Sequence, residues 1–178
     1  GPVAEVVFAI AYIISPANEF IIKFVMFLSV VEIIVLISPR VSNEKLLLFS
    51  WCPLVLFQFS LNAHIDSLAV VLVFSALVYN QHRIWWIAPV LLSLAIMTKI
   101  FAILSVPFIL VSKRQYFLTT LLLSLIYIPL LFSGKHEFLG LSVMAEFWMF
   151  NSLFYSVWVY WFDNLWIKVI SLITFLIC

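Results

Sequence analysis

Charged residues are scarce in this sequence. Of its 178 residues only 10% are Asp, Glu, Lys or Arg, whereas 66% are hydrophobic. A soluble domain needs about a quarter of its residues charged to cover its surface, so the composition excludes an ordinary soluble enzyme and a disordered segment. Nine basic and eight acidic residues nearly cancel, to a net charge of +1. That balance excludes a basic surface for the phosphates of nucleic acid, and we expect no nucleic-acid partner.

Cysteine and glycine are scarce as well. The two cysteines, Cys52 and Cys178, stand far apart in apolar stretches, so they make neither a disulfide framework nor a metal site. Three glycines are few for a transporter, because transporters commonly build their substrate sites from broken, glycine-rich helices. Apolar residues are abundant instead, with a mean hydropathy of +1.25. Since lipid offers no partner for free backbone groups, this composition predicts membrane-spanning helices.

Polar residues divide the chain into apolar segments that we expect to be helices. A helix that crosses roughly 30 Å of hydrocarbon needs about 20 apolar residues. Pro2–Ile14 is shorter, which predicts a helix at the membrane interface or the end of a longer span. The other predicted helices are Glu19–Ser38, Leu46–Leu61, Ser67–Tyr79, Ile84–Thr98, Phe101–Val111, Tyr116–Phe132, Asn151–Phe162 and Leu165–Cys178, with a mixed segment from Ser133 to about Phe150. Several are short, so we expect flanking polar residues to continue them.

The predicted fold class is therefore all-α, a polytopic transmembrane bundle of about six to eight helices with a short interfacial helix at the N-terminus. The sequence begins with Gly1 rather than Met and ends inside an apolar run at Cys178. We interpret residues 1–178 as a single transmembrane domain that is an internal piece of a longer protein, without its first span, first outer loop and C-terminal remainder.

The position of Lys99 determines which charged residues share a membrane face. A single helix from Ile84 to Ser112 would be about 43 Å long, which is too long for the hydrocarbon unless strongly tilted. Folding the chain back near Lys99 brings the arginine-bearing turns to one face, which the positive-inside rule makes cytoplasmic. That face carries Arg40, Lys45, Arg83, Lys113 and Arg114, and the outer face carries Glu19, Lys23, His64, Asp66, Lys99, Lys135, His136 and Glu137.

Asn62, His64 and Asp66 form the densest polar group on the predicted outer face. Together they offer a donor, an acceptor and a titratable ring for a sugar hydroxyl, a phosphate or a cation, although one His and one Asp make a weak metal site. Simpler interpretations stay open. Asp66 can serve only as the N-cap of the helix that follows, and His64 can be only an interfacial ring.

Lys99 and Asn151 are the other candidate binding residues. Lys99 is a compact ammonium where a lipid-linked phosphate would lie, although lysines at span ends also simply reach toward the headgroups. Asn151 is the one amide among the aromatic residues from Phe147 to Phe162. Those aromatics could stack on a sugar, but an interfacial aromatic belt is the commoner explanation.

Several stretches together resemble one enzyme family. The run WCPLVLFQFSLNAHIDSLAVVLVFSAL, followed by LLSLAIMTKIFAILSVPFIL, has a proline-containing span, a motif of the type G-H-x-D, a helix ending in T-K and a helix with proline. The opening GPVAEVVFAIAYIISP and the later FWMFNSLFY are similar to further family elements. The chain thus resembles the polyprenyl-phosphate-sugar-dependent glycosyltransferases of the GT-C superfamily, especially bacterial mannosyltransferase-like members.

The resemblance implies an integral-membrane enzyme of the bacterial plasma membrane. It would move a hexose, often mannose, from a polyprenyl-phosphate carrier to a glycan or lipid acceptor on the non-cytoplasmic side. The resemblance implies that His64, Asp66 and Asn151 are site residues and that Lys99 contacts the carrier phosphate. Asn62 stands where the family often has Gly, and Ile65 replaces a frequent Asn.

The implied chemistry needs a cation for the leaving phosphate and a carboxylate for the proton of the acceptor hydroxyl. In the family the base is usually an acidic residue of the first outer loop, which would precede Gly1. We expect Asp66 to support the site instead, because helix capping would constrain it. No metal ligand is assigned, and a divalent metal is left open. A transporter or flippase subunit and a non-catalytic membrane scaffold are the alternative functions.

Overall fold

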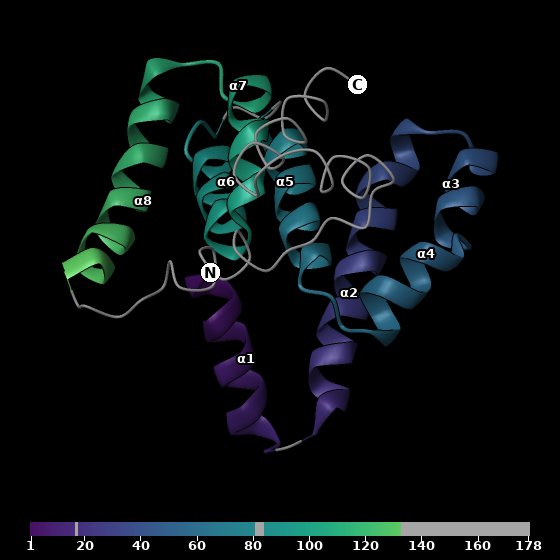
Figure 1. The fold of residues 1–178 in the computed structure, drawn as a ribbon. Helices are drawn as coiled ribbons and strands as arrows, with labels where there is room; N and C mark the ends of the chain where they lie inside the picture. Colours follow the sequence, from purple (N-terminus) through teal and green to yellow (C-terminus); the bar gives the residue numbers. More distant parts are fainter. Residues whose placement is uncertain (17, 81–83, 133–178) are drawn as a thin grey trace, which may run out of the picture. The chain divides into compact units, whose positions relative to one another are not determined.

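The computed structural model describes residues 1–16, 18–80 and 84–132, all within one compact unit, Gly1–Ser133. Every regular element in this part of the chain is helical, as the composition predicts (Figure 1). The α-helices are α1 (Pro2–Ile14), α2 (Glu19–Ile37), α3 (Asn43–Ser50), α4 (Pro53–Val55), α5 (Asp66–Asn80), α6 (Ile87–Thr98), α7 (Val106–Ile109) and α8 (Lys113–Phe132). The 3-10 segments η1 (Ser38–Arg40) and η3 (Ile100–Ser105) and the π-helical segment η2 (Leu56–Leu61) join them. A single domain over residues 1–178 stays a prediction.

Two of these helical stretches are long and apolar enough to cross a membrane. They are Glu19–Arg40 and Lys113–Phe132. A third span arises if Asn43–Ser50 and Pro53–Leu61, which are bent by 45° at their break, count as one. Pro53 stands at the start of the second piece, where its missing N–H costs no helical hydrogen bond. The prediction of membrane-crossing helices is confirmed to that extent.

Helices α5 and α6 make the most extensive contact between described elements. Many of the buried residues of the two helices are small, and small residues let helix backbones approach closely. The buried small residues are Ser67, Ala69, Ser75 and Ala76 on α5 and Ala88, Ser93 and Ala95 on α6. A core cluster of Ala76, Ala88, Leu92, Ile96, Ile109 and Leu110 continues the contact toward α7.

The chain folds back at Lys99, as the sequence predicts. Helix α6 ends at Thr98, and Lys99 has extended backbone angles (φ −145°, ψ 119°) before η3 begins. The returning segment reaches the far end of α5, where the Asn80 side chain donates to the Ile109 carbonyl at 2.6 Å. The expectation that polar residues continue the short helices holds for α5, which includes Asp66 and Asn80, and is wrong for α6, which stops before Lys99.

Helices α2 and α5 are in contact and run in the same direction, both rising from the lower part of the view in Figure 1. The Ser67 hydroxyl contacts the Met26 sulfur at 3.2 Å near the start of α5. Counted from these two residues at about 1.5 Å per residue, Arg40 and Asn80 both lie about 20 Å further along. Arg40 therefore lies toward the same end as Asn80, opposite the end where α5 begins.

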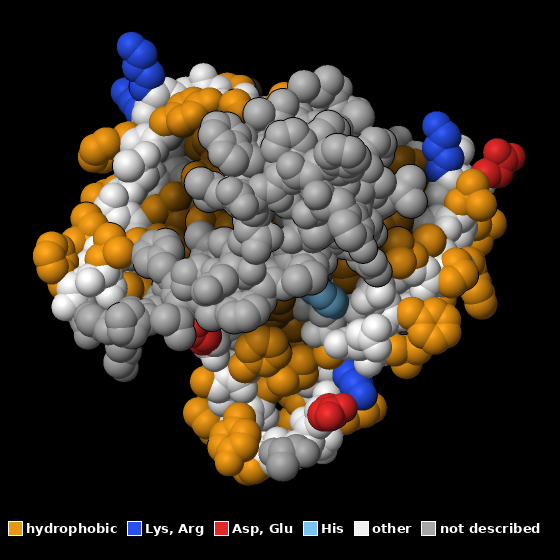
Figure 2. All heavy atoms as spheres, in the orientation of Figure 1, with side chains coloured by type: hydrophobic (Ala, Val, Ile, Leu, Met, Phe, Trp, Pro, Cys, Tyr) orange, Lys and Arg blue, Asp and Glu red, His pale blue; other side chains and the backbone are white. Residues whose placement is uncertain are grey.

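Helix α8 begins at that same end. Gln115 is buried there and donates from Nε2 to Asn80 Oδ1 at 2.7 Å. Its Oε1 accepts from the backbone N–H groups of Val111 and Ser112 at 3.0 and 3.2 Å. Lys113 and Arg114 are therefore far from the start of α5, and Figure 2 shows basic side chains at the upper edge of the view, over the ends of α8 and α3. Arg83 lies outside the described residues.

Helix α1 has the bounds that the sequence predicts and contacts α6 and α2. Its start lies against the end of α6, because a Cβ atom at Gly1 would meet the carbonyl oxygens of Met97 and Thr98. Most of its large apolar side chains are exposed, among them Ile13 at 78%. Its position at a membrane interface stays a prediction.

Candidate functional site

The loop before α5 is shaped by a residue with left-handed backbone. Ala63 has φ 51°, a region that non-glycine residues seldom adopt. It follows the π-helical segment η2, whose end is closed by hydrogen bonds from the N–H groups of Asn62 to the Phe57 carbonyl (2.9 Å) and of His64 to the Gln58 carbonyl (3.1 Å). A left-handed residue just past a helix end reverses the chain in this way. His64 is thereby turned back toward the start of α5.

The glycine-like position of this motif is Ala63 and not Asn62. The family resemblance drew attention to Asn62, where Gly is frequent. Asn62, however, has φ −84° and ψ 0°, which any residue adopts. The position at which the backbone favours glycine is one residue later, because Ala63 has the positive φ.

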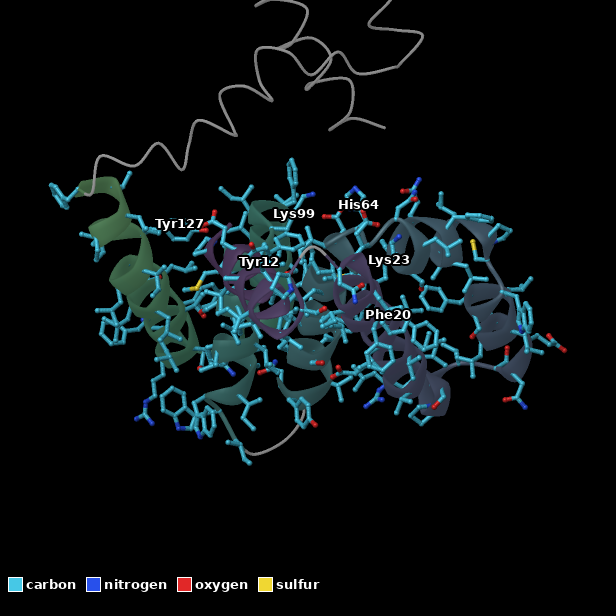
Figure 3. The ribbon with its side chains drawn as sticks, turned by 90° about the horizontal axis from the view of Figure 1, so that it is seen from below. Tyr12, Phe20, Lys23, His64, Lys99 and Tyr127 are labelled. Carbon is cyan, nitrogen blue, oxygen red and sulfur yellow. The ribbon has the colours of Figure 1, made fainter. Side chains whose placement is uncertain are left out.

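Asp66 joins two other candidate residues. Its Oδ2 lies 3.0 Å from Nδ1 of His64, and its Oδ1 lies 2.6 Å from Nζ of Lys99. The Lys99 contact is an ion pair without the alignment of a hydrogen bond, since Oδ1 is buried and has no hydrogen-bond donor. Figure 3 looks onto this end of the helices, with His64 and Lys99 side by side. The sequence analysis placed these residues on one face, and the structure brings them into contact there. Their role as binding residues stays a prediction.

The expected capping role of Asp66 is wrong. Asp66 is the first residue of α5 rather than the residue before it. Its side chain turns sideways to His64 and Lys99, and the first-turn N–H groups of Ser67 and Leu68 point to the carbonyls of His64 and Ile65. Asp66 is thus held by its contacts with Lys99, at the end of α6, and with His64, in the loop.

The helix ends stabilise this pair of charges. Asp66 lies at the N-terminus of α5, and Lys99 lies just past the C-terminus of α6. The partial charges at those ends favour an anion at the first and a cation at the second. Because the two helices are antiparallel neighbours, both favourable positions fall at one end of the hairpin. Both side chains are about one-third exposed (36% and 31%), so water screens the pair only partly.

A cavity of about 590 Å³ opens beside the pair. Asp66, Lys99 and Ser105 supply its polar groups, and the other lining residues are apolar: Ala69, Val70, Val73, Phe74, Phe101, Ala102 and Leu104. An apolar cavity with a charged group at one point suits an amphiphilic ligand whose anionic head meets Lys99. Sequence patterns had not singled out Phe101, Leu104 or Ser105, because apolar residues near Lys99 look the same whether they face lipid or a cavity.

Asn62 does not join this cluster. The Asn62 side chain is exposed and donates to Oε1 of Gln58, at 3.5 Å. Asn151 lies outside the described residues, as do Lys135, His136 and Glu137 of the predicted outer face. Within the described ranges, no group of three or more His, Cys, Asp or Glu side chains could hold a metal ion.

Comparison with known families assigns this chain. A family model described as "Alpha-(1->6)-mannopyranosyltransferase, N-terminal domain" matches residues 10–114, more than half of the sequence. The chain belongs to this mannosyltransferase family. It is a GT-C family of bacterial mannosyltransferases, so the resemblance seen in the sequence is confirmed. The match includes the loop with His64, the start of α5 and Lys99. No curated protein and no solved structure matched the chain.

Proposed function

We propose that this mannosyltransferase chain binds a polyprenyl-phosphate hexose, with mannose as the sugar, and takes part in its transfer to a glycan or lipid acceptor outside the cytoplasm. Family membership supports the mannosyl transfer. The observation that supports a lipid-linked donor is the position of Lys99, which lines a largely apolar cavity.

The cavity and Lys99 match the two parts of such a donor. A polyprenyl chain is a branched hydrocarbon, and burying it gains about 0.8 kcal/mol per CH₂ group removed from water. The phosphate carries a negative charge that needs a fixed cation. A membrane-embedded lysine that faces a cavity is a functional candidate, because an ammonium is costly to keep near lipid without a purpose.

Lys99 would act on the leaving group. When the acceptor hydroxyl attacks the anomeric carbon, the bond from that carbon to the phosphate oxygen breaks, and negative charge grows on the phosphate. A preorganised ammonium stabilises this charge better than bulk water does. Asp66 is not assigned as the base for the acceptor proton, because its two carboxylate oxygens are engaged by His64 and Lys99.

The sorting of charges supports a non-cytoplasmic site. Arg40, Lys113 and Arg114 lie toward the end of the α5–α6 hairpin opposite Asp66 and Lys99. Basic residues in short loops favour the cytoplasmic side of a membrane. The Asp66–Lys99 end then faces outward, and the acceptor would be a glycan or lipid of that side.

The test is transfer of radiolabelled mannose from a synthetic polyprenyl-phosphate mannose by the full-length protein in lipid vesicles. Lys99→Met is expected to lower the transfer rate by about a hundredfold, the usual effect of removing one group that stabilises a developing oxyanion. Lys99→Arg, which keeps the charge but changes its shape, is expected to keep part of the activity.

Lys23→Met is the matched control. Lys23 lies on α2 and pairs with Glu19 at 2.9 Å, so the same chemical change there removes a lysine outside the cavity. Its transfer rate is expected to stay near that of the parent protein. Equal rates for the parent and Lys99→Met, with equal amounts of folded protein in the vesicles, would reject the assignment of Lys99.

A further inference from the structure

Asp66 connects two groups of different chemistry, and this connection suggests how the site responds to its donor. One carboxylate oxygen contacts Lys99 and the other contacts His64. Lys99 and Asp66 line the cavity, whereas His64 is not among the lining residues. An anion that enters the cavity therefore meets Lys99 and reaches His64 only through Asp66.

The charges of the unliganded site balance. Lys99 contributes +1, Asp66 contributes −1, and His64 is neutral when it carries one ring proton. A phosphodiester brings one further negative charge. Its phosphate competes with Oδ1 of Asp66 for the Lys99 ammonium, and Oδ1 is a buried oxygen with no hydrogen-bond donor to replace Lys99. A buried carboxylate oxygen that loses its counter-ion is costly.

We propose that Asp66 is an exchangeable counter-ion, so that binding of the donor phosphodiester to Lys99 is coupled to uptake of a proton by His64. This inference rests on the proposed function. Nδ1 lies 3.0 Å from a carboxylate oxygen, which accepts and does not donate, so a ring hydrogen on Nδ1 would face Asp66 and Nε2 would take up the further proton. The proton comes from the solvent buffer and bonds to Nε2. The net charge of the liganded site then returns to zero.

No other charged residue of the neighbouring described elements could compensate the charge of the bound phosphate in this way. Apart from Asp66, α5 carries no charged residue, and α6 and η3 carry none. On α2, Lys23 and Glu19 neutralise one another, and Glu32 is exposed. On α1, Glu5 is exposed as well. His64 is thus the titratable group in direct contact with the carboxylate that donor binding would release.

The coupling has a definite sign. Because the liganded site would bind a proton at His64 more tightly than the free site does, the donor would bind more tightly at lower pH. We expect a higher affinity at pH 6.5 than at pH 8.5.

Calorimetry tests this directly. The probe is mannosyl phosphoryl farnesol, a phosphodiester whose own charge is constant over this pH range, titrated into the full-length protein in nanodiscs. Heats measured at pH 7.5 in two buffers of different ionisation enthalpy give the number of protons taken up per probe bound. We expect net proton uptake by the parent protein and its loss in His64→Gln, with affinity of the Gln variant independent of pH.

Asp66→Asn separates this coupling from a merely structural role. Removing the competing carboxylate is expected to tighten probe binding several-fold and to abolish proton uptake, whereas loss of a structural contact would weaken binding. If Asp66→Asn does not fold, His64→Gln decides alone. Probe binding without proton uptake in the parent, or unchanged uptake in His64→Gln, would overturn the coupling and leave the proposed function standing. Absence of probe binding, or equal binding by Lys99→Met, would overturn the Lys99 assignment and the coupling together.

Discussion

Gln115 Nε2 donates to Asn80 Oδ1 at 2.7 Å and thereby ties the start of α8 to the end of α5. The same amide donates to the Trp85 carbonyl at 3.3 Å, and its oxygen accepts from the Val111 and Ser112 N–H groups. One buried side chain thus satisfies backbone groups of two loops. This bonding holds the closed end of the α5–α6 hairpin whose open end carries Asp66.

Replacing Gln115 with Leu should therefore cost stability. The change removes the partner of the part-buried N–H groups of Val111 and Ser112 and of Asn80 Oδ1, and a buried polar group left without a partner costs about 1–3 kcal/mol. We expect the free energy of unfolding to fall by about 3 kcal/mol, measured by denaturant titration in detergent. Thr120→Val, on the exposed side of the same helix, should change it by less than about 0.5 kcal/mol. Equal effects of the two changes would contradict the role given to Gln115.

Ala63 should prefer glycine. With φ at 51°, a Cβ atom strains the backbone by roughly 1–2 kcal/mol, and glycine relieves that strain. Ala63→Gly should keep or raise the melting temperature, and Ala63→Val should lower it. Ala9→Gly is the matched control because Ala9 is an exposed residue inside α1, where glycine costs about 1 kcal/mol. A fall in melting temperature for both glycine variants would show that Ala63 does not need left-handed backbone.

Filling the cavity should affect the lipid part of the donor. Val70 lines the cavity, and Val70→Trp would occupy part of the space that a polyprenyl chain needs. We expect the KM for a long-chain donor to rise about tenfold, with a smaller rise for a farnesyl donor and little change in kcat. Leu77→Trp, at an exposed position of the same helix, should leave KM unchanged. The same rise for both chain lengths would argue against a chain-binding cavity.

Cysteine labelling can test the orientation across the membrane. In a full-length background with Cys52 and Cys178 replaced by Ser, Asn62→Cys should react with an impermeant maleimide added to intact cells. Glu44→Cys should react only after the cells are opened, because Glu44 lies in the first turn of α3, on the side of Arg40. Both positions are exposed. Labelling of Glu44→Cys in intact cells would reverse the assignment of the faces.

Charge and length patterns were sufficient to predict the hairpin around Lys99 and the placement of His64, Asp66 and Lys99 on one face, but not the contacts among them. A lysine inside a long apolar run admits few folds, and antiparallel helices bring their opposite termini together. The sequence could not give the direction of the Asp66 side chain, because an acid before a helix has the same pattern whether it caps that helix or pairs with a neighbouring one. The Asn80–Gln115 bond also escaped prediction, since two separate amides give no periodic signal.

Helix α5 has 15 residues and is therefore about 22 Å long. A hydrocarbon layer is roughly 30 Å thick, so with the Asn80 end at one headgroup level, the Asp66–Lys99 pair lies about 8 Å below the opposite one. A carrier lipid would then not need to lift its phosphate clear of the bilayer to reach Lys99. In the proposed orientation, the outer leaflet would be thinned or wetted around this hairpin, and that recess would give the water-soluble sugar a path to the Asp66–Lys99 pair.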